Sequence, residues 1–408
     1  MKQSILQSIK HKSQLISNYA SRNANILVFM FIFAQNHWIR QLYMYTNDNR
    51  TVITLDAGGT NLVFGAMRGC KYITDPLTYP SNAHNLDLCL NTMVKGFSQI
   101  IKRLDKRPVA ISFAFPGPAD YPNGIIGGYL PNFPSFREGV ALGHFLENKF
   151  GLPVFINNDG DLFAYGEALC GALPEINRKL AQTGSSKRYK NLLGYTFGTG
   201  FGVGIVVNGQ LNRGDNSCVE TFCLPHKTKP VIISEEGVSI RAIKRVYSEL
   251  SGDHSHNYEP EEIFRIASGT FPGDIDAAKK AFAEFGETAG HSMAIAAQLI
   301  DGIIVIGGGI TGAKKYFLPS LLKELRSSLS TLGGETVRRI QMEVFNLDDP
   351  TEFSKFAKGN TKRITIPGTD KTVEYDDMKR IGITFSKLGA NLAISTGAYV
   401  FALSELDN

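Results

Sequence analysis

The sequence predicts a two-domain α/β protein, and three observations lead to this prediction. A chain of 408 residues is long enough for two domains. Three apolar runs, at 108–115, 153–156 and 302–306, are nearly continuous, as is typical of buried parallel strands, and stretches of helical periodicity lie between them. Two pairs of apolar runs, within 51–67 and 192–207, each flank a glycine-rich turn, so each half of the chain is expected to begin with a hairpin.

The remaining elements follow in chain order. The apolar residues of 86–104 recur on one helical face. Glycine, proline and asparagine mark 121–134 as a loop at a strand end, a place where function is often found. Further helices are predicted at 138–150, 161–170, 235–250, 260–267, 274–299, 319–332 and 389–406. Irregular structure is expected at 208–230 and 252–260, a β-excursion at 341–380, and a last strand at 381–385.

The first 43 residues differ from the rest of the chain. They are rich in Ser, Asn and Gln and carry five basic and no acidic residues, so residues 44–408 have no net charge and no basic field for nucleic acid. Their apolar run, 26–34, is too short to cross a bilayer, and we expect no membrane partner. The segment can be a signal peptide, a transit peptide, or an annotation artefact preceding a true start at Met44. We favour the artefact; peptides from 1–43 in the native protein would rule it out.

The cysteines point to a reducing compartment. They number five and are scattered along the chain, which indicates reduced thiols and not a disulfide framework. We therefore expect a cytoplasmic protein.

The stretch 54–61 holds the first candidate site. An apolar run ends in Asp56, and Gly58, Gly59, Thr60 and Asn61 follow. Glycine allows the backbone to approach a ligand closely, and free N–H groups at such a tip can bind a phosphate. A carboxylate beside a phosphate can hold a Mg²⁺ ion that keeps most of its waters. An ordinary tight hairpin is the alternative.

Two more glycine clusters close apolar strands. Gly198–Gly204 offers Thr199, Gly200 and several unobstructed backbone N–H groups, as a phosphate clamp requires; a plain glycine-rich β-turn is the alternative. The cluster 307–309 can admit an adenosine. It also matches a dinucleotide fingerprint, which we discount because it lies far along the chain with only one acid near the expected offset.

Asp159 is the best candidate for a general base. It lies at the C-terminal end of the predicted strand 153–156, where α/β sheets place their ligands. Asn157 and Asn158 precede it, and amides bind sugar hydroxyls. A carboxylate that accepts a hydroxyl proton during phosphoryl transfer is ordinary kinase chemistry. The alternative is that Asp159 caps the following helix.

Together these motifs resemble those of the ROK family, which comprises bacterial sugar kinases and sugar-responsive repressors. The order is the family's, over about 51–402. The motifs are Asp56-Ala-Gly-Gly-Thr60, Phe115-Pro-Gly-Pro118, Leu130-Pro-Asn132, Asn158-Asp159 with Gly166-Glu167, Gly198-Thr-Gly-x-Gly-x-Gly204, Glu220 and Gly307-Gly-Gly309.

The resemblance implies the two-domain actin/hexokinase-like (ribonuclease H-like) fold with an interdomain cleft, and ATP- and Mg²⁺-dependent phosphorylation of a hexose or N-acetylhexosamine. It implies Asp159 as the catalytic base and Asp56 as a Mg²⁺ ligand through water. Asn132, Asn158 and Glu220 resemble sugar ligands, and Glu235 or Glu236 resembles a second sugar-contacting Glu; charge at a helix N-terminus is the alternative for that Glu. Gly58, Gly59, Thr60, Thr199 and Gly200 resemble phosphate-loop residues, and Gly308 and Gly309 the adenosine site. A homodimer is also implied.

One departure from the family pattern concerns zinc. Most members continue from the Glu at 220 into a Gly-His pair and a zinc site of one His and three Cys, whereas this chain reads Phe222-Cys223 and has no Cys-rich stretch at 224–234. Cys218, Cys223 and His226 can in principle hold a metal, but tetrahedral zinc sites usually contain closer cysteine pairs. We therefore expect no zinc and a rebuilt sugar pocket.

We place a small α/β domain at 44–158, with the C-terminal helix 389–408 packing back on it, and a large α/β domain at 159–388. The leading functional hypothesis is an ATP-dependent sugar kinase. The alternatives are a sugar-sensing transcriptional regulator without activity and an actin-like ATPase with a non-sugar substrate. The presence of Asp159 and of all three glycine clusters favours catalysis.

Overall fold

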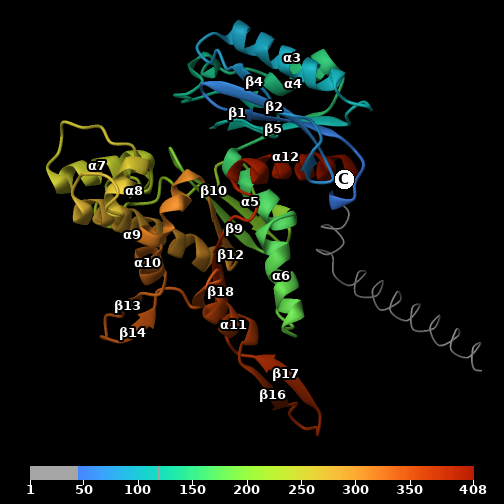
Figure 1. Ribbon diagram of the computed structural model, residues 1–408. Helices are drawn as coiled ribbons and strands as arrows, with labels where there is room; N and C mark the ends of the chain where they lie inside the picture. The colour runs from blue at the N-terminus through green and yellow to red at the C-terminus, as the bar shows by residue number, and fades with distance from the viewer. Residues whose placement is uncertain (1–44, 118) are drawn as a thin grey trace, which may run out of the picture.

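Two six-stranded sheets form the framework of the protein in the computed structural model, which describes residues 45–117 and 119–408 (Figure 1). The predictions for 1–43 concern residues outside this described part. In the first sheet the strand order is β3-β2-β1-β5-β8, with β4 paired to β2. The bounds are β1 Val52–Ala57, β2 Asn61–Arg68, β3 Lys71–Tyr72, β4 Leu77–Pro80, β5 Ala110–Ala114 and β8 Val154–Asn157.

The second sheet has the order β11-β10-β9-β12-β18-β15. Its strands are β9 Leu192–Phe197, β10 Phe201–Val207, β11 Gln210–Leu211, β12 Ile303–Gly307, β15 Glu343–Asn346 and β18 Arg380–Phe385. Three small two-stranded sheets lie outside the framework: β6–β7 (Ala119–Asp120, Ile125–Ile126), β13–β14 (Ser328–Ser330, Thr336–Arg338) and β16–β17 (Thr361–Thr365, Thr372–Asp376).

The two large sheets share one pairing pattern. In the first, β1 is antiparallel to β2 and parallel to β5, which is parallel to β8. In the second, β9 is antiparallel to β10 and parallel to β12, which is parallel to β18. The predicted α/β class, with a hairpin at the start of each half, is confirmed. The hairpin registers pair Ala57 with Leu62 and Phe201 with Phe197, so the glycines form both tips.

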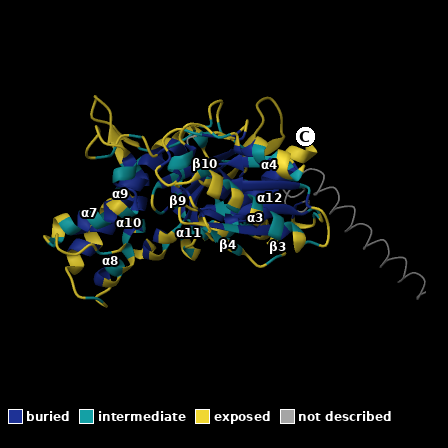
Figure 2. Ribbon diagram, turned by 90° about the horizontal axis from the view of Figure 1, so that it is seen from above, coloured by how far each residue is buried: buried dark blue, intermediate teal, exposed yellow. Residues whose placement is uncertain are grey.

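Three apolar cores lie between the two large sheets and the helices that pack on them. Helices α3 (Leu86–Lys102) and α4 (Leu142–Phe150) cover the outer face of the first sheet. The outer face of the second sheet packs on α7 (Ile240–Ser251), α8 (Pro260–Ala267), α9 (Ile275–Ile300) and α10 (Lys314–Leu325). Between the sheets lie α5 (Asp159–Leu169), α6 (Ala172–Gln182) and α12 (Ala390–Asp407). Figure 2 shows these strands and central helices as the buried interior.

Helices α5 and α12 each pack on the sheet of the opposite half. Helix α5 follows β8 of the first sheet but packs on β9 and β10 of the second, while α12 follows β18 of the second and packs on β1, β5 and β8 of the first. The two helices touch through glycines. A Cβ on Gly166 would overlap the carbonyl oxygen of Ala393, and one on Gly397 would overlap that of Leu162. Backbone therefore meets backbone where the halves join, which only glycine allows.

Several predicted elements need correction. The helix predicted at 319–332 is Lys314–Leu325; Pro319 lies inside it, and residues 328–330 are strand β13. The region 341–380 is more than a β-excursion: its strand β15 belongs to the second large sheet, and it also contains the helix α11 (Pro350–Lys358). Helices α4 and α7 start later than predicted, at Leu142 and Ile240, and α6 was not predicted. No helix in the described part is long and apolar enough to cross a membrane.

Candidate active site

The N-terminus of α5 presents the candidate base. Strand β8 ends at Asn157, and Asn158 is the N-cap of α5: its Oδ1 accepts hydrogen bonds from the N–H groups of Gly160 at 2.6 Å and Asp161 at 3.2 Å. The capping role considered for Asp159 thus belongs to Asn158. Helix α5 begins at Asp159, two residues earlier than predicted, because the asparagine cap initiates it.

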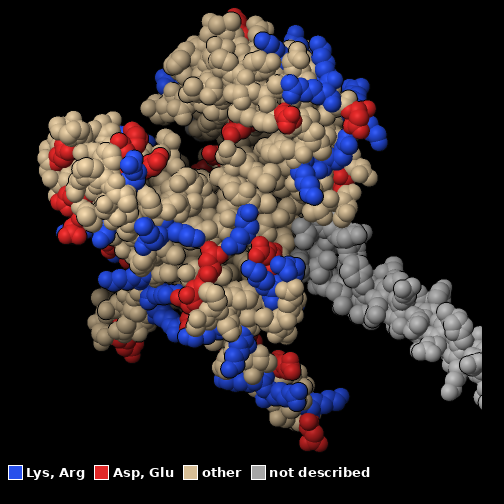
Figure 3. All heavy atoms as spheres, viewed as in Figure 1, with Lys and Arg blue, Asp and Glu red and all other residues tan. Residues whose placement is uncertain are grey.

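Asp159 lies at the start of α5, near enough to Asp56 of the first lobe and Glu220 of the second for its charge to raise the pKa of each. Figure 3 shows acidic side chains in the hollow between the two lobes. Water reaches the Asp159 carboxyl, whereas protein surrounds it on its other sides, and this desolvation raises its pKa above the ordinary value of 3.8. Its Oδ1 accepts the Gly160 N–H at 2.8 Å. No hydrogen bond to Oδ2 is found among the described residues, so this oxygen can accept a proton.

Glu220 lies beside Asn158. The Nδ2 of Asn158 donates to Oε1 of Glu220 at 3.0 Å, so the cap residue also orients the carboxylate. Burial, Asp161 and Asp159 together raise the pKa of Glu220 to about 8, and burial raises that of Asp161 to about 7. The structure thus brings together three acids with raised pKa values, a pattern that marks ligand sites more often than structural ion pairs.

Asn132 lies against the first glycine turn. A Cβ added to Gly59 would come within 3.0 Å of the Asn132 Cβ. The turn is fixed by the Gly58 N–H, which donates to the Asn61 oxygen at 2.9 Å, and by Ser81 Oγ, which donates to the Gly59 oxygen at 2.5 Å. Gly59 and Asn132 are both exposed, so phosphate-loop and sugar candidates share one surface of the first lobe.

Glu235 belongs to the second glycine turn. Its Oε2 accepts the Phe201 N–H at 3.1 Å, and its Oε1 accepts from Arg241 Nη2 at 3.1 Å. A Cβ on Gly200 would lie 2.7 Å from Oε2, so glycine is needed where this carboxylate crosses the turn. Thr199 is exposed at the tip. Glu235 also contributes to the raised pKa of Glu220, which places it at the edge of the acidic cluster.

The third glycine cluster opens into a cavity. Gly308 has φ 95°, and a Cβ there would overlap the Phe197 backbone, whereas one on Gly309 would meet open space. The cavity, about 420 Å³, is bordered by these glycines and by the N-terminus of α12, which includes Asn391. Its open backbone wall can accept a flat adenine ring and ribose, so the residues present fit the adenosine part of ATP.

Asp56 is the next-to-last residue of strand β1, where its backbone pairs with Ala114 of β5. Burial, and then the nearby charge of Asp159, raises the pKa of Asp56. Two carboxylates that repel each other favour a cation between or beside them, and Mg²⁺ takes one or two carboxylates with waters and phosphate oxygens. The donor set therefore fits Mg²⁺. Asn391 borders both the adenosine cavity and the cavity that Asp56 borders, so the two are adjacent.

Three residues of this site were not predicted as part of it. Asp161 is buried next to the candidate base. Tyr121 is buried, donates to the Phe115 oxygen at 2.8 Å and lies near Asp159 and Glu220. Arg213 donates to Asn157 Oδ1 at 2.9 Å, and its charge opposes part of the rise in the Asp161 pKa that burial causes. Only Asp161 left a sequence signal, as a second acid in the same helical turn; the other two depend on tertiary contacts.

Known proteins were compared with this chain. The ROK family profile matches residues 52–222. A glucokinase from Parabacteroides distasonis, known as a crystal structure, is 59% identical and superposes with a TM-score of 0.81 over 88% of this chain and 99% of its own. A β-glucoside kinase from Listeria monocytogenes is 27% identical over 69% of this chain and 88% of its own. A xylose repressor from Bacillus spizizenii is 28% identical over a segment that covers 31% of this chain and 30% of the repressor.

This chain belongs to the ROK family. The hexokinase-like arrangement of two similar α/β halves around a cleft agrees with that membership.

The zinc site of most ROK members has no equivalent donor set here. Cys218 and Cys223 are exposed free thiols, and the Cys218 Sγ donates to the Asn216 oxygen at 3.1 Å. His226 instead points its Nε2 toward Thr288 Oγ1, 3.5 Å away. Within 45–117 and 119–408 no group of three or more His, Cys, Asp or Glu side chains could hold a metal ion. The residues present at this place therefore do not fit zinc.

Proposed function

We propose that this sugar kinase of the ROK family transfers the γ-phosphoryl group of Mg-ATP to a hydroxyl of glucose or a closely related hexose, with Asp159 as general base. The observation that carries the proposal is the exposed Asp159 carboxyl: one oxygen accepts the Gly160 N–H, the other has no hydrogen bond among the described residues, and the Asn158–Glu220 pair lies nearby. The 59% identity to a glucokinase supports a hexose as acceptor.

The sugar is bound by groups that surround the base. Asn158, Glu220 and Asn132 offer amide and carboxyl groups from both lobes, and such groups pair with the hydroxyls of a sugar ring. Because Glu220 has a pKa of about 8, it is mostly protonated at neutral pH and can donate as well as accept a hydrogen bond. Glu235 lies farther along the same cluster and is the candidate for an additional hydroxyl contact.

Proton removal from the acceptor hydroxyl falls to Asp159. Its raised pKa, caused by desolvation, makes it a stronger base than an ordinary aspartate. The proton passes to Oδ2 as the hydroxyl oxygen attacks the γ-phosphorus, and the bond from that phosphorus to the bridging oxygen of ADP breaks. Such a base typically contributes about 10²–10⁴-fold to the rate.

The nucleotide is bound by backbone. Gly58, Gly59 and Thr60 from one lobe and Thr199 and Gly200 from the other offer N–H and hydroxyl groups to phosphates, and Gly308 and Gly309 wall the adenosine cavity. Bound Mg²⁺ would neutralise phosphate charge, with Asp56 holding it through water. Closure of the lobes would exclude water, which suppresses ATP hydrolysis.

The test is a coupled ADP-release assay with Mg-ATP and a panel of glucose, mannose, fructose, allose, N-acetylglucosamine and N-acetylmannosamine. We expect turnover on glucose or a close relative. The D159N variant should lose about 10²–10⁴-fold in kcat with sugar binding kept, whereas the surface control D105N should match wild type. A D159N variant with near wild-type turnover would exclude Asp159 as the base.

Two alternative functions give different outcomes in the same assay. Sugar binding by calorimetry without turnover would indicate a sugar-sensing regulator, a class that the similarity to a xylose repressor brings into consideration. ATP hydrolysis without sugar binding or sugar-dependent turnover would indicate an ATPase with a non-sugar substrate.

A further inference from the structure

Residues 222–235 form a hairpin that joins two sides of the candidate sugar pocket. The Glu235 N–H donates to the Phe222 oxygen at 3.1 Å, the Ser234 N–H to Leu224 at 2.8 Å, and the His226 N–H to Ile232 at 2.8 Å. The hairpin (residues 222–235) ends in Glu235, and Glu220 lies two residues before its start. It therefore joins the backbone segments that carry these two carboxylates. This is the segment that takes the place of the family's Cys-rich stretch.

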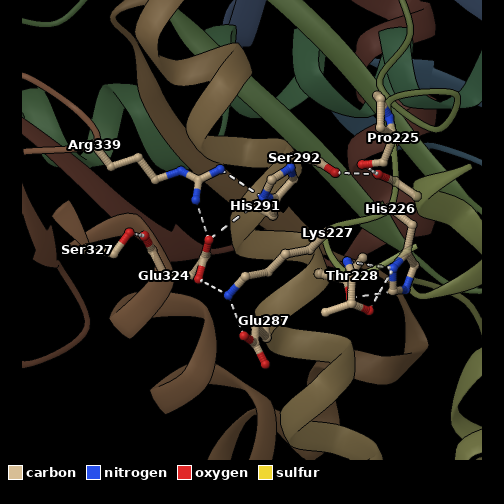
Figure 4. Close-up of polar contacts among 12 residues, drawn as sticks. Pro225, His226, Lys227, Thr228, Glu287, His291, Ser292, Glu324, Ser327 and Arg339 are labelled. Carbon is tan, nitrogen blue, oxygen red and sulfur yellow. Dashed lines mark hydrogen bonds and ion pairs between the residues drawn. The ribbon is translucent and has the colours of Figure 1, made fainter. Parts of the chain in front are cut away.

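Lys227 anchors the hairpin to two helices of the large lobe (Figure 4). Its ammonium group forms an ion pair with Glu287 of α9 and another with Glu324 of α10, the latter at 2.7 Å. The Glu324 side chain is only 7% exposed, so its charge needs partners. Arg339 supplies the second cation on Oε1 of Glu324 and also bonds His291 Nδ1 at 2.8 Å.

A second set of contacts fixes the hairpin next to this network. Ser234 Oγ and Ser292 Oγ are 2.7 Å apart, and both residues are fully buried. His226 packs against Gly237, where a Cβ would come 2.5 Å from its Nε2. The α9 partners of the hairpin are Glu287, Thr288 and Ser292, and their spacing places them on one helical face. His291, on the same face, bonds Arg339 instead.

We propose that Lys227, Glu324 and Arg339 are positioning residues that hold the hairpin, and through it Glu220 and Glu235, in the place where most family members use zinc. The proposal rests on the proposed sugar-kinase function for its effect on affinity. Its physical basis is that one buried carboxylate with two cation partners joins three separate segments, as a tetrahedral metal would. Removing the lysine leaves Glu324 less well compensated and removes the ion pairs that join the hairpin to Glu287 of α9 and Glu324 of α10, so only the serine and histidine contacts with α9 remain.

The test compares K227M and E324Q with the conservative variant K227R and the control K244M. Lys244 forms an ion pair with Glu259 at 2.7 Å elsewhere in the large lobe, so K244M removes a similar pair without touching the hairpin. The readouts are the KM for sugar, the KM for ATP, hydrogen exchange of peptides covering 222–237, and the zinc content of the purified protein.

We expect K227M and E324Q to raise the KM for sugar about tenfold, which corresponds to about 1.4 kcal/mol, with the KM for ATP within about twofold of wild type. Exchange in 222–237 should increase at least severalfold, while K227R and K244M behave like wild type. If K227M does not fold, the proposal is tested by comparing E324Q with K227R in the KM for sugar and in hydrogen exchange of 222–237. Unchanged exchange, or faster exchange with an unchanged KM for sugar, would overturn the proposal, as would one zinc ion per chain. A wild-type protein that phosphorylates no sugar refutes the proposed function instead, and the exchange measurement still decides whether the network holds the hairpin.

Discussion

Replacing Glu220 with glutamine should stabilise the protein without ligand, and should do so more as the pH rises. The pKa of Glu220 is about 8, compared with an ordinary value of 4.5. Between these two values the folded state keeps a proton that the unfolded state has released, so folding becomes less favourable as the pH increases through this range. Glutamine carries no titrating proton and can still accept the hydrogen bond from Asn158 Nδ2.

The magnitude follows from the shift. One pKa unit corresponds to about 1.36 kcal/mol, so a shift from 4.5 to about 8 has an upper limit of about 5 kcal/mol above pH 8. Water in the cleft screens the acids that surround Glu220, which reduces the expected gain to about 2 kcal/mol. The gain should vanish below about pH 4.5 and be complete above about pH 8.

The assay is denaturant unfolding of wild type and E220Q at several values between about pH 5 and pH 9. The surface variant E249Q, whose residue is exposed and paired with Arg245, is the control. Parallel stability curves for E220Q and wild type would refute the reasoning, because they would mean that Glu220 titrates normally. The same variant should bind sugar more weakly, so stability and affinity should change in opposite directions.

Three further predictions concern the contact between α5 and α12, the nucleotide site and the base. G397A should lower the free energy of unfolding by about 2 kcal/mol or more, because its Cβ would overlap the Leu162 backbone oxygen; G312A, where a Cβ meets open space, should not. T199A should raise the KM for ATP severalfold with little change in the KM for sugar, and equal losses would contradict the phosphate-clamp assignment. As the pH falls through the raised pKa of Asp159, kcat/KM should decline because the base becomes protonated, and a flat acid limb in a pH–rate profile would contradict this.

The sequence was most informative where local chemistry determines structure. Glycine-tipped hairpins and continuous apolar strands predicted the fold class, and the apolar run at 153–156 predicted the strand that Asp159 follows. The start of α5 was misplaced by two residues because Asn158 as N-cap competes with later acids for that role. The start of α10 was predicted too late along the chain because proline is favoured at the first position of a helix, whereas Pro319 lies inside α10.

What depends on distant contacts was not predictable. Lys227 is 60 residues from Glu287 and 97 from Glu324, and no local pattern links them. Arg213 lies in a segment that gives no periodic signal, yet it reaches Asn157 from 56 residues away. Strand β15 lies in the region predicted as a β-excursion, but its place in the large sheet was not predicted, because that place depends on its parallel pairing with the distant strand β18.

The exchange of α5 and α12 between the halves has a mechanical consequence. Each helix begins at the cleft, α5 with Asp159 and α12 beside the adenosine cavity, and each is fixed to the sheet of the opposite half. Because the helices meet backbone to backbone at Gly166 and Gly397, neither can slide without the other. A rotation of one lobe would therefore move the proposed base and the proposed nucleotide cavity together. Sugar binding and nucleotide binding would then be coupled through one rotation of the lobes.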